Sequence, residues 1–228
     1  MPQRGFLGRD FFEAHFLECA RDLVGCELVW NGCAGRIVET EAYAVLGDEA
    51  CHTFARAGAR AFVERNPPGA AYVYLNYGIH WLLNVLVKGE SEQGIILIRA
   101  LEPTRGIPLM EERRRTTSQR ALCSGPGKLA QVLGIRGTDH ERSLCSGAGI
   151  GFRPGTRPVS VVCDKRIGIS RAKYLPWRFL EEGSPYVSVP PGGAGQRASD
   201  RRGKKTKPGK PAWSSKNRAP RGETDYLE

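Results

Sequence analysis

The segment Arg36–Tyr43, RIVETEAY, alternates with the period of two that is typical of a β-strand. The alternation places four residues on one face, Ile37, Glu39, Glu41 and Tyr43, and small apolar residues on the other. Carboxylates beside an aromatic ring on a rigid strand suit general-base chemistry next to a ring-shaped substrate. An antiparallel strand with a solvated polar face has the same pattern, so the pattern alone leaves both interpretations open.

Other segments follow helical or strand periods, and together they predict one α+β domain. A capping box of Asp10 and Glu13 predicts a helix that begins at Asp10 and ends near Gly25. The remaining patterns predict strands over Cys26–Val29, Gly35–Tyr43, Ile95–Ala100, Val159–Cys163 and Gly183–Val189. They predict one helix over Pro103–Arg115 and another that stops near Gly134. Ala44–Pro68 is predicted to be a loop, and Leu175–Glu181 a short ordered segment. We expect a curved, mostly antiparallel sheet with flanking helices.

The most aromatic stretch, Tyr72–Val87, predicts two strands that are joined by a tight turn at Gly78. Tyr72 and Tyr74 share a face, and Tyr77 falls near the tip, where neighbouring side chains cover it poorly. An aromatic residue at such a tip can act as a wedge in a base stack. An aromatic that folds back on its own hairpin is the commoner arrangement, and the pattern does not decide between them.

Two polar residues interrupt strands that are otherwise apolar. Asn84 needs a hydrogen-bond partner if it is buried, and either a ligand or the backbone can supply one. Arg99 ends an apolar strand on the same face as Leu97, and a buried guanidinium requires an acidic partner. Glu41 meets that requirement, so we expect Arg99 and Glu41 to pair.

Two loops carry groups that can meet phosphate. The glycine-rich loop Leu122–Leu129 opens a helix with free N–H groups and includes Lys128. Its spacing differs from that of a Walker loop, and a plain helix cap explains it equally well. The loop Ala44–Pro68 contains His52 and several arginines, among them Arg60, which either contact phosphates or are solvated.

Charge narrows the choice of partner only slightly. The 228-residue chain has a formal net charge of +10, and residues 197–228 hold ten Lys or Arg against four Asp or Glu. That segment therefore contributes +6 and leaves +4 for the rest, so the body is only mildly basic and indicates a polyanionic partner weakly. Gly, Pro, Ser, Lys and Arg predominate from Pro190 onward, which predicts a domain over residues 1–190 and a disordered basic tail over residues 191–228.

Cysteine usage and hydropathy predict a cytoplasmic protein. The seven cysteines are scattered without a CxxC pair, which indicates reduced thiols rather than a disulfide framework or a zinc site. No apolar run approaches the length of a membrane span, and the N-terminus lacks the apolar centre of a signal peptide. We expect no membrane partner, no metal and no cofactor.

Five segments occur in an order that resembles the alkyladenine (3-methyladenine) DNA glycosylase family, and the resemblance covers Asp10 to Val189. They are Arg36–Tyr43 (RIVETEAY), Tyr72–Gly78 (YVYLNYG) with Asn84, Leu97–Pro103 (LIRALEP), Leu122–Leu129 (LCSGPGKL) and Gly183–Val189 (GSPYVSV). The resemblance implies a monofunctional base-excision enzyme that flips a damaged purine out of double-stranded DNA and hydrolyses its N-glycosidic bond. It also implies that the Tyr72–Val87 hairpin inserts into the DNA, and we expect a monomer that is associated with the nucleoid if the source is bacterial.

The same resemblance implies roles for individual residues. Glu41 resembles the general base that activates a water, and Arg99 and the backbone carbonyl of Ile167 resemble the groups that hold this water. Tyr77 resembles the residue that fills the space left by the flipped base. Asn84 resembles the gate that clashes with the amino group of normal guanine. The remaining assignments are the base-pocket residues Tyr43, His52, Tyr74 and Leu97 and the DNA-backbone candidates Arg60 and Lys128.

The chemistry of alkylated purines agrees with these roles. A cationic base such as 3-methyladenine or 7-methylguanine leaves without a general acid, so one base and one water suffice. Tyrosines stack on a flipped base and attract its charge. Neutral ethenoadenine and hypoxanthine are further candidate substrates, although hypoxanthine needs protonation and no acid stands out. No lysine is marked as a Schiff-base nucleophile, which predicts that the enzyme has no lyase activity.

Two departures from the family pattern concern DNA contacts. The family has a Thr-Pro-Arg-Asn-like run between His52 and Tyr72, where this chain has Gly58-Ala59-Arg60-Ala61, and Asn76 replaces a residue that is commonly hydrophobic. Three other functions remain open from the sequence: a damage-binding protein without catalysis, an RNA-binding module, and a formyltransferase-like enzyme of similar architecture.

Overall fold

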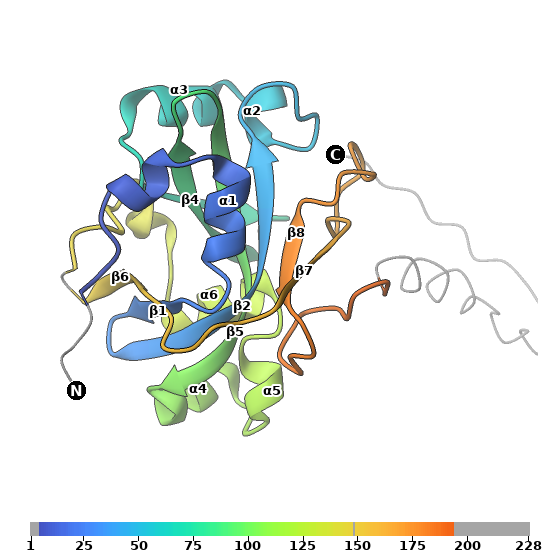
Figure 1. Cartoon of the computed structure of the whole chain (residues 1–228). Coiled ribbons are helices and arrows are strands. Elements are labelled where there is room, and N and C mark those ends of the chain that lie inside the picture. Colours follow the sequence, from blue (N-terminus) through green and yellow to red (C-terminus); the bar gives the residue numbers. More distant parts are fainter. Residues whose placement is uncertain (1–4, 148, 194–228) are drawn as a thin grey trace, which may run out of the picture. The chain divides into compact units, whose positions relative to one another are not determined.

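The computed structural model describes residues 5–147 and 149–193 (Figure 1). These residues form one α+β domain around a curled antiparallel sheet, which confirms the predicted fold class. The predicted tail lies outside the described residues except for positions 191–193. Within the described ranges, no helix combines the length and the apolar character that crossing a bilayer requires. All seven cysteines are free thiols.

Strands and helices are interspersed along the chain. The strands are β1 (Glu27–Trp30), β2 (Cys33–Ala44), β3 (Ala71–Asn76), β4 (His80–Lys88), β5 (Gln93–Arg105), β6 (Ile150–Arg153), β7 (Val161–Asp164) and β8 (Arg178–Glu181). The helices are η1 (Asp10–Glu13), α1 (Phe16–Asp22), α2 (His52–Ala55), α3 (Ala57–Arg65), α4 (Ile107–Arg114), α5 (Gln119–Leu122), α6 (Pro126–Leu133) and η2 (Gly137–Asp139).

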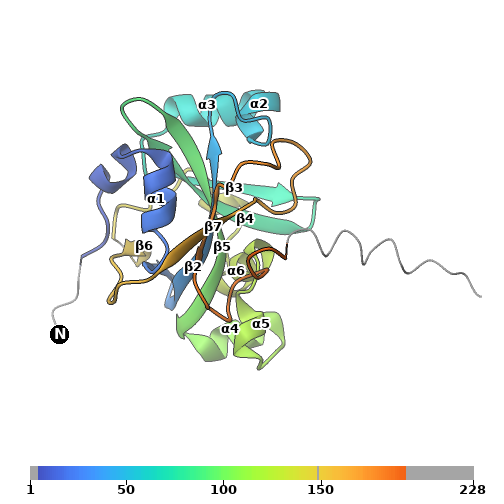
Figure 2. The same ribbon diagram turned by 45° about the vertical axis from the view of Figure 1, so that its right-hand side comes forward.

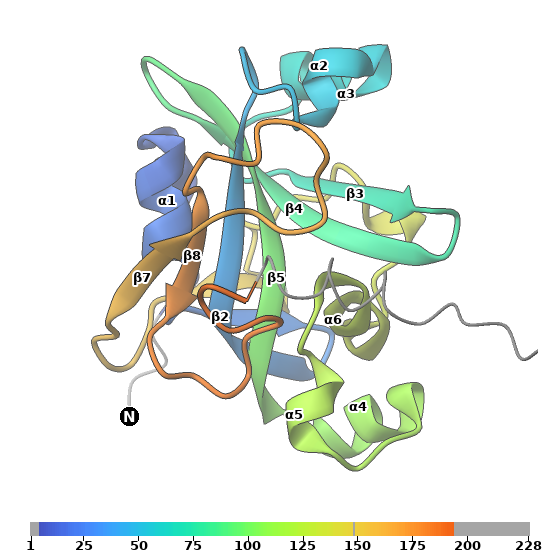
Figure 3. The ribbon, with the colours of Figure 1, turned by 90° about the vertical axis from the view of Figure 1, so that its right-hand side faces the viewer.

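The two longest strands, β2 and β5, form the centre of the sheet (Figure 3). The strand order is β3-β4-β5-β2-β1-β6, and β8 pairs with both β2 and β7. Helix α1 packs beside β2 and α6 packs beside β4 and β5 (Figure 2). The main core fills the space between these helices and the sheet, and a smaller apolar cluster around Phe62 and Leu86 lies beneath α3.

The register between β2 and β5 shifts at three places, and two of these shifts, the β-bulges at Val38 and Arg99, lie next to Glu39 and Glu41. A bulge inserts one extra residue into a strand and so reverses the alternation of side chains beyond it. Ile37 consequently lies in the main core and does not share the face of Glu39 and Glu41, so that part of the prediction is wrong. The second bulge leaves Arg99 without a paired residue on β2, where its side chain reaches both carboxylates.

The first helix begins later than predicted. Residues Asp10–Glu13 form the short 3-10 helix η1, which has no side-chain cap, and the extended backbone at Ala14 separates it from α1. His15 caps α1 instead, because the backbone N–H of Leu17 donates to His15 Nδ1 at 3.3 Å. The predicted capping box is therefore wrong.

Three further segments differ from their predictions. The predicted loop Ala44–Pro68 contains α2 and α3, which bury only one short apolar face around Phe62. The predicted helix Pro103–Arg115 starts only at Ile107, because its first residues continue β5. The predicted strand Gly183–Val189 consists of turns and bends, since its backbone bonds to a side chain of β2 rather than to a neighbouring strand.

The β3–β4 hairpin has the predicted two strands and tight turn, and it projects away from β2 and β5 (Figure 3). The backbone N–H of Ile79 donates to the Asn76 carbonyl at 3.0 Å across the turn. Tyr77 and Gly78 both have positive φ, 51° and 69°, as tight hairpin turns favour. Tyr77 is 84% exposed, which excludes the alternative that it folds back on its own hairpin.

Candidate active site

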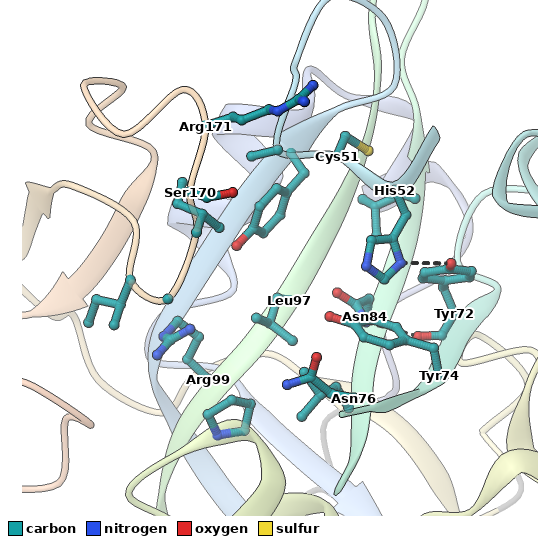
Figure 4. A pocket seen from close by; sticks show the side chains of 18 of the residues that line it. Cys51, His52, Tyr72, Tyr74, Asn76, Asn84, Leu97, Arg99, Ser170 and Arg171 are labelled. Carbon is teal, nitrogen blue, oxygen red and sulfur yellow. Dashed lines mark hydrogen bonds between the residues drawn. The ribbon is translucent and has the colours of Figure 1, made fainter. Parts of the chain in front are cut away.

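A pocket of about 510 Å³ opens between β2, the β3–β4 hairpin, α2 and the loop after β7 (Figure 4). The structure brings most of the predicted site residues to this pocket. Those that line it are Tyr43, His52, Tyr74, Tyr77, Asn84, Leu97, Arg99 and Ile167. The residues come from five separate segments of the chain, and the curled sheet is what gathers them.

Aromatic side chains form one wall of the pocket. The rings of His52 and Tyr74 lie 4.3 Å apart, centre to centre, and His52 Nδ1 lies 3.0 Å from the hydroxyl of Tyr72. Tyr72 packs in turn on Phe62 at 4.9 Å, in the smaller apolar cluster. Packing from behind therefore fixes these rings, and a wall that is fixed in advance loses little entropy when a ligand binds.

Asn84 lies in the pocket and is buried. Its Nδ2 donates to the backbone carbonyl of Tyr72 at 3.0 Å. In the sheet, Asn84 lies opposite Leu97 of the neighbouring strand β5. The backbone is thus the partner of the amide donor, and the hydrogen bond holds the Asn84 side chain in one orientation.

The Glu41 carboxylate accepts three hydrogen bonds. Glu41 Oε2 accepts from the Tyr43 hydroxyl at 2.7 Å and from Arg99 Nη1 at 3.1 Å, and Oε1 accepts from the Ile167 N–H at 2.6 Å. The ion pair between Glu41 and Arg99 confirms the prediction that these two residues pair. Glu41 is completely buried, which excludes the alternative of a solvated polar face. Glu41 does not itself line the pocket, whereas all three of its donors do.

A second carboxylate, Glu39, belongs to the same cluster, and the sequence argument gave it no role. Glu39 accepts from Arg99 Nε at 3.0 Å and from Arg178 Nε at 2.7 Å. The N–H and hydroxyl of Ser188 also donate to it, at 2.6 and 2.8 Å. Arg178 pairs in addition with Asp164. The alternation of Glu39 with Glu41 was a signal for its position, but its partners are remote in sequence.

Burial sets the charge states around the pocket. Burial lowers the pKa of His52 to about 4, with a further contribution from the charge of Arg56, so His52 is neutral at pH 7. Burial also raises the pKa of Tyr74 to about 12. For Arg99, burial disfavours the cation, but the neighbouring Glu41 and Glu39 outweigh it and raise its pKa.

The DNA-backbone candidates, Arg60 and Lys128, do not line the pocket. Arg60 is exposed on α3 and donates from Nη1 to the Thr53 carbonyl at 2.7 Å. Lys128 is half-buried in the first turn of α6, where its Nζ donates to Ser124 Oγ at 3.1 Å. Two other exposed arginines line the pocket instead. Arg56 is one of the arginines of the predicted loop Ala44–Pro68, whereas the sequence argument gave Arg171 no role.

A wall of aromatic rings that pack edge to face suits a single planar ring, and an ion-paired carboxylate behind it suits hydrolysis where that ring is attached. This geometry is typical of hydrolases that enclose a ring-shaped group of a larger substrate. Comparison with known proteins gives the family within this class.

Residues 10–185 match the methylpurine-DNA glycosylase (MPG) family. Three similar proteins share the name "Putative 3-methyladenine DNA glycosylase". The protein from Rhodopseudomonas palustris strain BisB18 is 45% identical over 184 residues, which cover 81% of this chain and 91% of that protein. The protein from Rhizobium etli is 47% identical over 182 residues (80% and 88%), and that from Nitrosospira multiformis is 43% identical over 179 residues (78% and 92%).

This chain belongs to the methylpurine-DNA glycosylase family, and it is a DNA glycosylase of base-excision repair. The finding confirms the resemblance that five short segments indicated. DNA is accordingly its substrate.

Proposed function

We propose that this glycosylase removes alkylated purines, chiefly 3-methyladenine and 7-methylguanine, from double-stranded DNA and leaves an abasic site. The observation that carries the proposal is the Glu41 carboxylate, which Tyr43, Arg99 and Ile167 hold directly behind the wall of an aromatic pocket. The names of the relatives support the same class of substrate. We also expect the enzyme to act as a monomer in the cytoplasm or on the nucleoid.

Binding begins with rotation of the damaged nucleotide out of the helix. Flipping costs a few kcal/mol, and stacking on an aromatic side chain returns about 1–3 kcal/mol per base. Tyr43, Tyr74 and His52 supply such contacts, and Tyr77 enters the space that the base leaves. A neutral His52 adds no positive charge to the wall that meets a cationic purine.

Hydrolysis needs one water and one base. The Glu41 carboxylate removes a proton from the water, and the water oxygen forms a bond to C1′ of the deoxyribose. The N-glycosidic bond breaks, and its electron pair neutralises the positive charge of the departing purine. Glu41 also stabilises the oxocarbenium-like charge of the sugar. We place the water between Arg99 and Ile167, because both line the pocket and contact Glu41.

The pocket discriminates by charge and by shape. Neutral ethenoadenine and hypoxanthine leave more slowly than cationic purines, because their departing nitrogen must be protonated. We assign to Asn84 the rejection of the amino group of normal guanine, since its hydrogen bond to the Tyr72 carbonyl fixes it in the pocket. 7-Methylguanine carries the same amino group, so 3-methyladenine should be released faster.

The reaction should stop at the abasic site. A lyase forms a Schiff base between an amine and the sugar. Among the described residues, no lysine lines the pocket, which supports a monofunctional enzyme.

The test is a single-turnover reaction with duplex DNA that contains one 3-methyladenine or one 7-methylguanine. We expect release of the free base, an alkali-labile abasic site and no adduct after borohydride treatment, while undamaged duplex stays intact. A trapped protein–DNA adduct would contradict the monofunctional assignment. Tight binding of the damaged duplex without any base release would identify a damage-binding protein instead.

A further inference from the structure

Arg166 is a buried cation beside the pocket that the mechanism above does not use. It lies near the start of the loop that joins β7 to β8. Residues 167–171 of this loop line the pocket, and Figure 4 shows Ser170 and Arg171 there. Its ion-pair partner, Asp48, lies between β2 and α2, and both side chains are fully buried. The ion pair therefore joins two chain segments that border the pocket.

The guanidinium of Arg166 contacts three parts of the chain at once. Nη2 donates to Asp48 Oδ1 at 2.9 Å, and Nη1 donates to the second oxygen of Asp48. Nη1 also donates to the backbone carbonyl of Ala42 in β2, at 2.9 Å. Nη2 lies 3.3 Å from the carbonyl of Ala172, further along its own loop. A charge-assisted bidentate pair is among the strongest polar contacts in a protein.

The flat face of the same guanidinium stacks on aromatic rings. Its central carbon lies 4.5 Å from the centre of the Tyr43 ring and 5.2 Å from that of Trp177. Tyr43 donates its hydroxyl to Glu41, and Ile167, the residue after Arg166, donates its N–H to Glu41. Two of the three donors to Glu41 are thus held by Arg166, one through stacking and one through the chain.

We propose that Arg166, anchored by Asp48, is a positioning residue that holds the Ile167 N–H and the Tyr43 hydroxyl on the Glu41 carboxylate. The inference rests on the proposed role of Glu41 in hydrolysis. This positioning role requires a guanidinium, because the planar group can bind Asp48 and stack on two aromatic rings at the same time. A lysine ammonium is a point charge and cannot do both. Asp48 also neutralises this cation, so it adds no net charge beside a cationic base.

The test compares Arg166→Lys with Arg36→Lys. Arg36 is a matched control, because it is also mostly buried, with 13% of its side chain exposed, and pairs with Glu102 and Glu181. Arg36 does not line the pocket. Both substitutions keep the charge and remove the fork, so both should lower the thermal stability. Only the change at Arg166 should alter the site.

Two measurements report on the position of Glu41 and its hydrogen-bond donors. In the free protein, hydrogen exchange of the Ile167 amide should be faster in Arg166→Lys than in the wild type and unchanged in Arg36→Lys. In single turnover, a displacement of this kind should lower base release by about 100-fold in Arg166→Lys. Binding to duplex DNA with an abasic site should change little, since that DNA places no base against Tyr43.

The two measurements separate this inference from the proposed function. If the wild type releases no base, the proposed function fails, whereas exchange at Ile167 still tests the positioning. If Arg166→Lys matches Arg36→Lys in both exchange and base release, the positioning role is wrong. If Arg166→Lys does not fold, Asp48→Asn is measured against Glu102→Gln, with faster Ile167 exchange expected only in the former; equal exchange in the two would overturn the proposal.

Discussion

Glu39 and Glu41 lie two residues apart on one strand and have different surroundings. Neither carboxylate lines the pocket, and of the donors to Glu39, which are Arg99, Arg178 and Ser188, only Arg99 does. Glu41 is bonded only to groups that line the pocket. Surroundings of this kind separate a structural carboxylate from a reactive one. We therefore assign the chemistry to Glu41 and the neutralisation of buried arginines to Glu39.

The protonation of His52 provides a pH test at the scale of one residue. Burial lowers its pKa from 6.5 to about 4, so the unfolded chain takes up a proton at a higher pH than the folded protein does. The stability that His52 contributes is fully present above pH 6.5 and is lost as the pH falls through about 4. In NMR titration of the ring, we expect a midpoint near pH 4.

His52→Gln is the control for this titration, because it removes the titrating ring and keeps a polar side chain. The stability of the variant should fall less than that of the wild type between pH 6.5 and pH 4. A wild-type His52 midpoint near 6.5 would contradict the burial that the structure gives to this residue.

At the scale of elements, the β3–β4 hairpin positions two different parts of the site. Its strands carry Tyr74 and Asn84 in the pocket, while its turn presents Tyr77 at the rim. Tyr77 has a left-handed φ of 51°, a conformation that costs a non-glycine residue about 1–2 kcal/mol. The tight turn requires this φ, and an exposure of 84% leaves the ring free to make the DNA contact proposed above.

Tyr77→Ala should weaken binding to lesion-bearing duplex by about tenfold, since it removes one aromatic stacking contact. Tyr77→Phe keeps the ring and should behave like the wild type. Tyr174→Ala is the matched control, because Tyr174 is 76% exposed and does not line the pocket. The affinities can be compared by fluorescence anisotropy. Equal losses in Tyr77→Ala and Tyr174→Ala would remove the wedge role from Tyr77.

Elements with a strong local signal were predictable from the sequence, and the others depended on distant contacts. The β3–β4 hairpin followed from alternation around Gly78, and α6 followed from a glycine-rich start and a stop at Gly134, which has a left-handed φ of 72°. Helices α2 and α3 are short, and their apolar face is defined by the sheet beneath them. The bulges at Val38 and Arg99 have no local signature, so the position of Ile37 was wrong.

At the scale of the whole molecule, the site residues that could be predicted are those that strand alternation or the family resemblance indicates. Alternation placed Leu97 and Arg99 on one face, and the resemblance supplied the roles proposed for Glu41 and the pocket residues. The ion pairs that complete the site join residues 118 and 139 positions apart, Arg166 with Asp48 and Arg178 with Glu39. Such pairings depend on how the loop after β7 and the strand β8 pack on β2 and the segment that follows it, which no local pattern specifies.

The central claim is that Glu41 activates the water that releases the base. Glu41→Gln keeps the shape of the side chain, and Glu39 remains to neutralise Arg99, so the variant should fold and bind damaged duplex. The most direct measurement is single-turnover release of 3-methyladenine by wild type, by Glu41→Gln and by Glu102→Gln, a control that pairs with Arg36 outside the pocket. We predict a loss of about 10³-fold in Glu41→Gln alone. Equal release by all three proteins would contradict the account.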